Sequence, residues 1–203
     1  AQAAALTTAQ VAALSTTLVA ALTTADLRAL GAAAIDALSS TQLNALATDH
    51  IAALSTTQVA ALTTAQLSTL STTNLDAFTS AQVAALTTNE IASLTTAQIA
   101  ALGTAQVAAF TSTQVAALTT AQLNALNTTE IGALTSAQAA ALTTAQISSL
   151  TTDLLAALST TDLRALGSAQ IAALTSTQLN SLATDHVAAL TTAQVAGLTT
   201  NQI

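Results

Sequence analysis

Residues 6–13, LTTAQVAA, are one copy of an eight-residue unit that recurs along the whole chain without an insertion or deletion. Numbered from its leucine, the unit has Leu at position 1 everywhere except at Phe78 and Phe110. Position 6 is Val, Ile or Leu with two Ala exceptions, position 3 is almost always Thr or Ser, and position 8 is small and mostly Ala. Because the same positions stay apolar throughout, the repeat itself must determine the fold.

The few charged residues keep the same register. Acids fall at positions 4 and 5, and both signs fall at position 7, whereas positions 1, 2, 3, 6 and 8 carry no charge. An unpaired buried charge is very costly, so the pattern predicts that positions 1 and 6 face the interior and that positions 4, 5 and 7 face water. The residues are Asp49, Asp153 and Asp185 at position 4; Asp26, Glu90, Glu130 and Asp162 at position 5; Arg28, Asp36, Asp76 and Arg164 at position 7.

Neither a long helix nor a plain strand suits a period of eight. On a continuous helix, eight residues at about 100° each would carry the leucines around the whole cylinder. The repeats of coiled coils, seven or eleven residues, are absent. In a strand, positions 1 and 6 would point to opposite faces.

A short helix followed by a tight corner fits the pattern. We expect Thr8, at position 3, to be the N-cap, with Ala9 to Leu14 as the helix and Val11 and Leu14 on one face. An alternative places the cap at position 2, with Thr7 and Gln10 forming a capping box. Position 3 is preferred because position 2 becomes Ala at Ala47 and Ala183, and Ala caps poorly.

A helix of six residues is too short to persist alone, since about 12–15 residues are marginal in water. Neighbouring units must therefore bury each other's aliphatic faces. The predicted fold is an all-α solenoid of very short helices, one per eight-residue repeat, with about three repeats per coil. A β-solenoid is the alternative. We expect residues 1–203 to be a single continuous array and, because Ala1 enters at position 4 and Ile203 leaves at position 6, an excerpt of a longer one.

A second, longer period supports this view. Residues 22–67 reappear as residues 158–203, at an offset of 158 − 22 = 136 residues, or 17 octads. Rare residues move with the block, including the pairs Asp49-His50 and Asp185-His186. The sequence thus indicates duplication of a large block, which is unusual in a designed consensus array.

Composition narrows the possible partners. The net charge is −7 with only two Lys or Arg residues, which argues against nucleic acid and anionic membrane surfaces. Hydroxyl groups interrupt every apolar stretch, so no membrane insertion is expected. Cysteine is absent, which is compatible with secretion.

No residue pattern points to catalysis, a metal or a cofactor. His50 and His186 are the only histidines and stand 17 octads apart, whereas a metal or acid–base site needs several converging groups. We interpret each Asp as a first-turn helix residue and each His as a substitute for Gln on the wet face. Arg28 and Arg164 lie two residues from an acid, which on a helix is not the same face. The chain is not expected to be an enzyme.

Hydroxyl groups at positions 2 and 3 could form ladders on stacked coils. Such a Thr/Ala face resembles the ice-binding surface of some antifreeze proteins, so binding of a regular ligand such as ice or polysaccharide is a second hypothesis. Helix capping accounts for many of the same hydroxyls.

The array of Leu, two Thr or Ser, Gln or Asp, an aliphatic residue and Ala resembles the repetitive tracts of very large secreted bacterial surface proteins of the adhesin kind. The resemblance implies an extracellular or cell-surface spacer or filament-forming segment, self-associating end to end or side by side. The run Ala25–Arg28 also resembles the pentapeptide-repeat β-solenoids, whose period of five differs from the eight found here.

Overall fold

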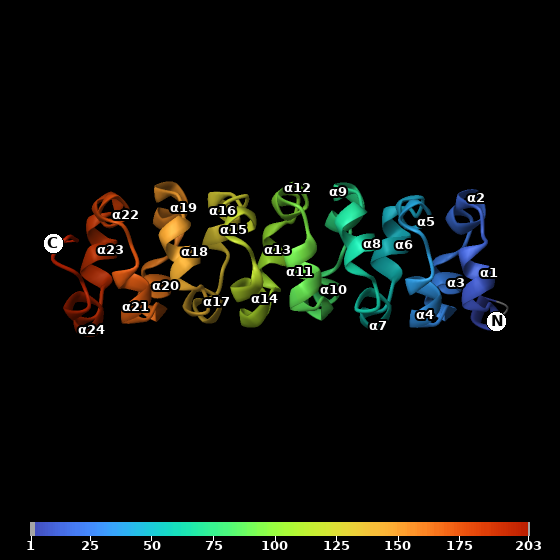
Figure 1. The fold of residues 1–203 in the computed structure, drawn as a ribbon, viewed down its shortest axis with the longest axis horizontal. Coiled ribbons are helices and arrows are strands. Elements are labelled where there is room, and N and C mark those ends of the chain that lie inside the picture. The colour runs from blue at the N-terminus through green and yellow to red at the C-terminus, as the bar shows by residue number, and fades with distance from the viewer. Residues whose placement is uncertain (1–2, 203) are drawn as a thin grey trace. The chain divides into compact units, whose positions relative to one another are not determined.

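The computed structural model describes residues 3–202, and within them each octad forms one short helix (Figure 1). A 3₁₀ turn at Ala3–Ala5 precedes the first α-helix, and the described residues contain no strand. The predicted all-α solenoid is therefore confirmed, and the β-solenoid alternative is not supported. The chain divides into two units, residues 1–102 and 103–203.

Each unit contains helices of four to six residues. Unit 1 comprises α1 (Thr8–Ala12), α2 (Thr16–Ala20), α3 (Thr24–Ala29), α4 (Ala32–Asp36), α5 (Ser40–Asn44), α6 (Thr48–Ala53), α7 (Thr56–Val59), α8 (Thr64–Thr69), α9 (Thr72–Asp76), α10 (Ser80–Ala85), α11 (Thr88–Ser93) and α12 (Thr96–Ala100). Unit 2 comprises α13 (Thr104–Ala108), α14 (Ser112–Ala117), α15 (Thr120–Leu123), α16 (Thr128–Gly132), α17 (Ser136–Ala140), α18 (Thr144–Ser149), α19 (Thr152–Ala157), α20 (Thr160–Ala165), α21 (Ser168–Ala172), α22 (Ser176–Ser181), α23 (Thr184–Ala189) and α24 (Thr192–Ala196).

Helices stack with a period of three. In unit 1, α4 packs on α1, α5 on α2 and α6 on α3, and in unit 2 α17, α18 and α19 pack on α14, α15 and α16. Three octads, or 24 residues, therefore make one coil of the solenoid, as the sequence predicted. Figure 1 shows this succession of short helices within each unit.

Positions 1 and 6 fill the interior, as predicted. In the coil formed by α4–α6, the position-6 residues Ile35, Leu43 and Ile51 are at most 1% exposed, and Leu38 and Leu46 at position 1 are at most 3% exposed. Burying one such side chain contributes about 1.5–3 kcal/mol. This packing stabilises helices that could not form alone.

The helices begin one residue earlier than predicted. Thr7, not Thr8, is the N-cap of α1, and it forms the capping box with Gln10 that the alternative proposed. The preference for position 3 was wrong because it treated Ala47 and Ala183 as incompatible with an N-cap. Both are N-caps, and both lack a side-chain hydrogen bond to the helix.

At α8 the chain leaves the helix through extended backbone rather than through a left-handed residue. Leu70, which ends α8, has φ −64° and ψ 137°. No described residue has a positive φ. The corner therefore needs no glycine, and a buried leucine at position 1 can both end the helix and fill the core.

Candidate functional site

The most regular polar feature of the structure is the glutamine at position 5, which is buried. Gln58 and Gln98 are each 2% exposed, and Glu90 and Glu130 are each 5% exposed. The prediction that position 5 faces water was therefore wrong. Because the helix starts at position 3, position 5 is the third helical residue, and its side chain turns back to the corner, where the preceding coil covers it.

Gln58 uses both ends of its amide. Its Oε1 accepts a hydrogen bond of 2.8 Å from the backbone N–H of Ser55, the N-cap of α7. Its Nε2 donates to the carbonyl oxygens of Leu27 and Leu30 at 2.7 and 2.8 Å. Those carbonyls belong to the end of α3, so each corner is hydrogen-bonded to the corner one coil earlier.

The same arrangement recurs in both units. Gln98 in unit 1 accepts from the Thr95 N–H at 2.8 Å and donates to the Leu67 and Leu70 carbonyls at 2.7 Å each. Gln146 in unit 2 accepts from Thr143 at 2.7 Å and donates to Val115 and Leu118 at 2.9 and 2.7 Å. This hydrogen-bonded arrangement consists of the N-cap, the position-5 side chain and the two carbonyls. We call it the glutamine corner.

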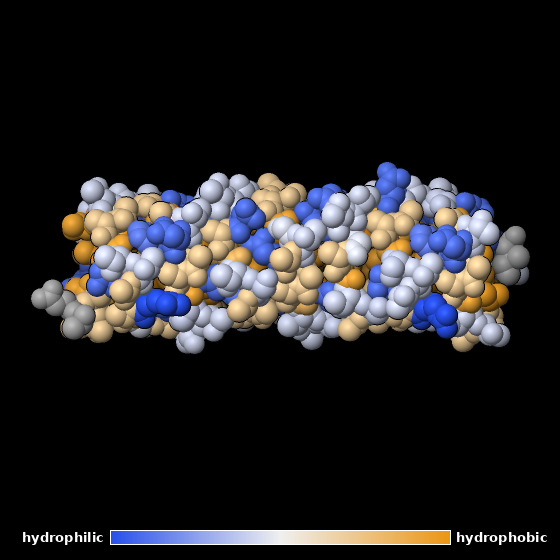
Figure 2. Space-filling model, turned by 180° about the vertical axis from the view of Figure 1, so that it is seen from behind, coloured by the Kyte–Doolittle hydropathy of each residue, from blue (hydrophilic) through white to orange (hydrophobic). Residues whose placement is uncertain are grey.

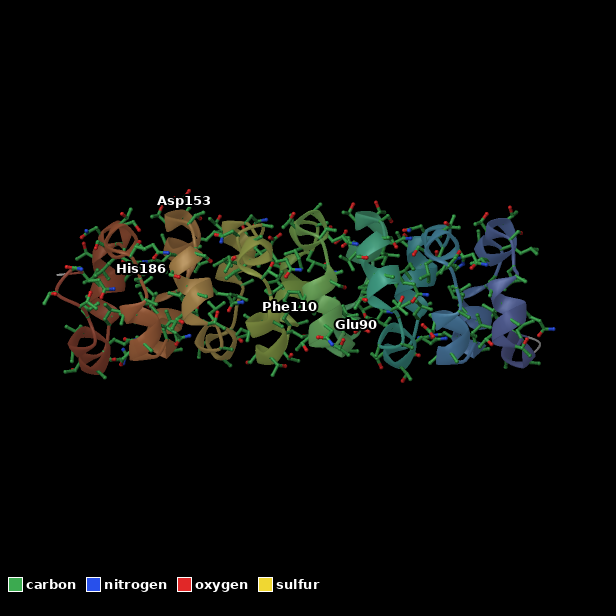
Figure 3. All side chains as sticks on the ribbon, viewed as in Figure 1. Glu90, Phe110, Asp153 and His186 are labelled. Carbon is green, nitrogen blue, oxygen red and sulfur yellow. The ribbon has the colours of Figure 1, made fainter. Side chains whose placement is uncertain are left out.

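Glutamine is the residue that this corner requires. It combines a carbonyl acceptor with an amide that has two N–H donors, whereas an ionised carboxylate only accepts. Glu90 of α11 therefore supplies half of the corner: its Oε2 accepts from the Thr87 N–H at 2.6 Å, but it has no N–H for a carbonyl (Figure 3). A buried polar group left without a partner costs about 1–3 kcal/mol.

Side-chain length matters as much as chemistry. Asn74, one methylene shorter, reaches the Leu43 and Leu46 carbonyls only at 3.4 Å each and forms no capping box with Ser71. The Ser71 N–H is instead bonded at 2.7 Å to Oδ1 of Asn44, a position-7 residue of the preceding coil.

In unit 2 as well, a position-7 asparagine replaces the position-5 side chain as the acceptor of an N-cap N–H. Leu154 stands at position 5 and cannot accept a hydrogen bond, and the Thr151 N–H is bonded at 3.1 Å to Oδ1 of Asn124. Asn124 also donates to the Ser149 carbonyl at 2.9 Å. At these two corners the position-5 residue does not accept the N-cap N–H. An asparagine at position 7 of the preceding coil accepts it instead.

Two aspartates at position 5 depend on neighbouring hydroxyls. Asp162 is 3% exposed and accepts from Ser159 Oγ at 2.6 Å and from Ser136 Oγ, on the preceding coil, at 2.9 Å. Asp26 accepts from Thr23 Oγ1 at 2.7 Å and from the Thr23 N–H at 3.2 Å. The hydroxyl bond first, and the backbone bond second, lower the pKa of the Asp26 carboxyl.

The histidines occupy corners without these bonds. His50 and His186 are half-buried, not on the wet face as interpreted from the sequence, and Nδ1 of each is buried without a hydrogen-bond partner. They lie in different units, His186 on α23 (Figure 3). Within residues 3–202, no group of three or more His, Cys, Asp or Glu could hold a metal ion.

Positions 4 and 7 face solvent as predicted. Asp153 projects outward from α19 (Figure 3) and Asp49 is exposed. Arg28 is also exposed, and its Nε donates to the Ala53 carbonyl of the next coil at 2.9 Å. Arg28 therefore joins adjacent coils through a backbone oxygen.

Hydroxyl groups at position 2 are largely committed to capping. Thr95 Oγ1, for example, accepts from the Gln98 N–H at 3.2 Å. Position 3 is freer, although Ser112 and Ser168 each donate at 3.1 Å to a carbonyl of the next coil. None of the described helices combines the length and the apolar character that crossing a membrane would require.

Repeated short helices, an aliphatic interior and one hydrogen-bonded corner per repeat define a helical repeat protein. Residues 19–56, 54–88, 88–120, 115–152 and 155–184 match the ALTTAQ repeat. The chain belongs to the ALTTAQ repeat family. No curated protein matches it.

Proposed function

We propose that this array is a structural spacer or filament-forming segment of an extracellular or cell-surface protein, that it self-associates, and that it carries out no catalysis. The observation that carries the proposal is the use made of the polar side chains. The glutamines and the position-7 asparagines join one coil to the next, and the position-2 hydroxyls cap their own helices. Each added coil of 24 residues can stack in the same way on the one before it, so the array can be lengthened without a new kind of interface.

A spacer predicts that whole coils can be removed and that fragments of a coil cannot. Deleting residues 48–71, three octads, should leave a folded protein with unchanged helix content per residue in circular dichroism. Deleting residues 48–59, one and a half octads, should disrupt the stacking. Equal tolerance of both deletions would contradict a role that depends on coil number.

Location needs a separate test. Antibodies against the repeat should label intact cells of the source organism, and external protease should remove the label. Labelling seen only after the cells are permeabilised would contradict the cell-surface part of the proposal and leave the spacer role standing.

A second candidate function, binding of ice or a polysaccharide, is supported by one face of unit 2. Helices α15, α18, α21 and α24 carry no charged residue. The threonines at position 3 of α15, α18 and α24 are exposed: Thr120, Thr144 and Thr192. Arg164, a position-7 charge of unit 2, lies on another helix, α20.

This candidate is tested by thermal hysteresis and by retention on insoluble polysaccharide. Replacing Thr144 and Thr192 together by Lys should abolish either activity, whereas Thr72→Lys, at the same position in unit 1, should not. An unmodified chain with no thermal hysteresis and no retention would rule the candidate out.

A further inference from the structure

Glu90 is a buried carboxylate with no positive charge beside it. It is 5% exposed, and one of its oxygens, Oε2, accepts the Thr87 N–H at 2.6 Å. Helices α7 and α8, in the coil that precedes α11, carry no charged residue, and the chain's two Lys or Arg residues, Arg28 and Arg164, lie on α3 and α20. Buried charges in proteins are paired or bind a metal ion, because an unpaired one is very costly. Glu90 therefore needs a partner that the described residues do not supply.

The repeat places the second oxygen of Glu90 against backbone carbonyls. In the octads before and after it, Nε2 of Gln82 lies 2.9 and 2.8 Å, and Nε2 of Gln98 lies 2.7 Å, from the carbonyl oxygens 31 and 28 residues earlier. The N-cap bond of Glu90 matches those of its neighbours, so its Oε1 takes the place of their Nε2. The carbonyls 31 and 28 residues before Glu90 are those of Val59 and Leu62, at and just after the end of α7.

Only hydrogen-bond acceptors meet at this corner. Gln66 donates to a third carbonyl, 30 residues earlier, at 3.0 Å, and the residue at that spacing from Glu90 is Ala60, the C-cap of α7. Within the described residues no hydrogen bond reaches the Leu62 carbonyl oxygen, whereas the corresponding carbonyl of Leu38 accepts from Gln66 at 2.6 Å. Oxygens of like partial charge repel one another at this range. The corner is therefore stable only with a positive charge between its oxygens.

We propose that this corner binds a small metal cation, Na⁺ or Ca²⁺, through the Glu90 carboxylate and the carbonyl oxygens of Val59, Ala60 and Leu62. We call these four residues the Glu90 corner. Carboxylate and backbone carbonyl oxygens are the ligands of Ca²⁺, and carbonyls at helix C-terminal ends also coordinate Na⁺. A proton on Glu90 could serve one carbonyl only, whereas a cation serves all of them. The cation thus replaces the amide of the glutamine corner and, like it, joins two coils.

The ligand set predicts which cation binds and how tightly. One carboxylate neutralises one positive charge, which suits Na⁺, whereas the flexible set of oxygens suits Ca²⁺. Mg²⁺ is a poor fit because it requires near-ideal octahedral geometry and gives up its water reluctantly. Binding should be weak, on the order of 0.1–1 mM for Ca²⁺. Figure 2 shows strongly hydrophilic residues only as separate patches on the face of each unit that it draws, so no dense acidic surface there competes for the ion.

The dependence of stability on cations tests the proposal. The reference chain carries Glu130→Gln, so that Glu90 is the only glutamate left at position 5. Its thermal unfolding midpoint is measured by circular dichroism in tetramethylammonium chloride, whose cation is too large for the corner, while Na⁺, Ca²⁺ or Mg²⁺ replaces it at constant ionic strength. The midpoint should rise with Na⁺ or Ca²⁺ and then level off, because a ligand of the folded state stabilises it by mass action. The ion that saturates the rise at the lower concentration is the preferred ligand, and Mg²⁺ should have little effect.

Two substitutions separate the Glu90 corner from general effects of salt. Adding Glu90→Gln to the reference chain supplies N–H donors for the carbonyls. The unfolding midpoint should then no longer depend on either ion and should equal or exceed that of the ion-saturated reference. Adding Asp153→Asn instead removes an exposed carboxylate of α19 and should leave the ion dependence unchanged.

Carbonyl ¹³C resonances locate the bound ion. Those of Val59 and Leu62 should shift as the ion is added to the reference chain and should stay fixed in the chain with Glu90→Gln. The proposal is overturned if neither ion raises the midpoint of the reference chain more than that of the Glu90→Gln chain, or if these resonances do not move. It is overturned equally if acid alone brings the reference chain to the stability of the Glu90→Gln chain while both ions have no effect, because a proton then occupies the corner.

Discussion

Helices α6 and α7 follow each other in unit 1, yet their corners are built differently. Ser55 and Gln58 begin α7 with a capping box and two hydrogen bonds to the end of α3. Ala47 begins α6 without a side-chain cap, and His50 leaves Nδ1 without a partner. Nevertheless, Ile51 of α6 is only 1% exposed. Burial of positions 1 and 6 is therefore sufficient to form a helix, and the glutamine corner strengthens a fold that the apolar positions already determine.

Unit 2 contains the same departure. Ala183 and His186 begin α23, again without a side-chain cap and with Nδ1 unpartnered. In both places the missing cap and the missing glutamine occur in one octad. The two losses are thus confined to one corner rather than spread over two.

The largest expected effect on the free energy of unfolding comes from the buried position-6 residue, which is present beside both kinds of corner. Ile51→Ala in α6 and Ile99→Ala in α12, which has a complete glutamine corner, should each lower the free energy of unfolding by about 2–5 kcal/mol, because each leaves a cavity in the interior. Urea denaturation followed by circular dichroism measures both. A loss at Ile51 much smaller than that at Ile99 would mean that the core contributes less where the corner is weak.

Removing one glutamine corner should have the next largest effect. In Gln58→Leu the Ser55 N–H and the Leu27 and Leu30 carbonyls lose their side-chain partner, which should cost about 1–3 kcal/mol. Leucine is a fair substitute because Leu154 is accommodated at the same position with 5% exposure. Gln10→Leu is the control: Gln10 is exposed, so its loss should cost less. Equal costs at both sites would contradict the role assigned to the bonds between coils.

The opposite change should improve the weaker corner. His50→Gln supplies an acceptor for the Ala47 N–H and donors for the preceding coil, and should raise the free energy of unfolding by about 0.5–1.5 kcal/mol. Adding Ala47→Ser restores the cap and should raise it further. The pair His186→Gln and Ala183→Ser repeats the experiment in unit 2. A loss of stability in both units would show that the histidine is favourable where it stands.

The asparagine replacement should show energetic coupling across coils. Asn44→Ala removes the acceptor of the Ser71 N–H and should cost about 0.5–1.5 kcal/mol. With Asn74→Gln already present, position 5 can accept that N–H, so the same substitution should cost less. A double-mutant cycle measures the difference. Strict additivity would mean that Asn44 and residue 74 do not share this task.

The sequence predicted the class of fold because the period of eight excludes the simple alternatives, and because positions 1 and 6 are apolar in nearly every octad. It misplaced the helix start by one residue, since Ala47 and Ala183 were read as evidence against a cap at position 2. The prediction that position 5 faces water had a different cause: acids such as Glu90 and Glu130 occur there, and they were read as solvent-exposed. The repeated choice of Gln, with Glu, Asp or Asn as frequent replacements, was the available signal, because an exposed position would not need an acceptor so regularly.

The sequence could not show which groups accept the hydrogen bonds of the glutamine Nε2. Nε2 of Gln58 bonds to carbonyls 28 and 31 residues earlier, and that separation follows only once three octads are known to form one coil. Side-chain reach is equally hidden: Asn74 and Gln66 are both amides, yet Asn74 is 3.4 Å from the Leu46 carbonyl, whereas Gln66 is 2.6 Å from that of Leu38.

The smallest expected effect concerns the corner whose position-5 residue is Asp26. In the folded protein the Thr23 hydroxyl, and to a lesser degree the Thr23 N–H, stabilise the ionised Asp26 and lower its pKa. The resulting stabilisation is present above the pKa of Asp26 in the unfolded chain and is lost as the pH falls through the lowered, folded value. Thr23→Val removes the hydroxyl and keeps the N–H, so an NMR titration should find the Asp26 pKa higher than in the unmodified chain. An unchanged titration would mean that the hydroxyl does not set it, and that this corner relies on its backbone bond alone.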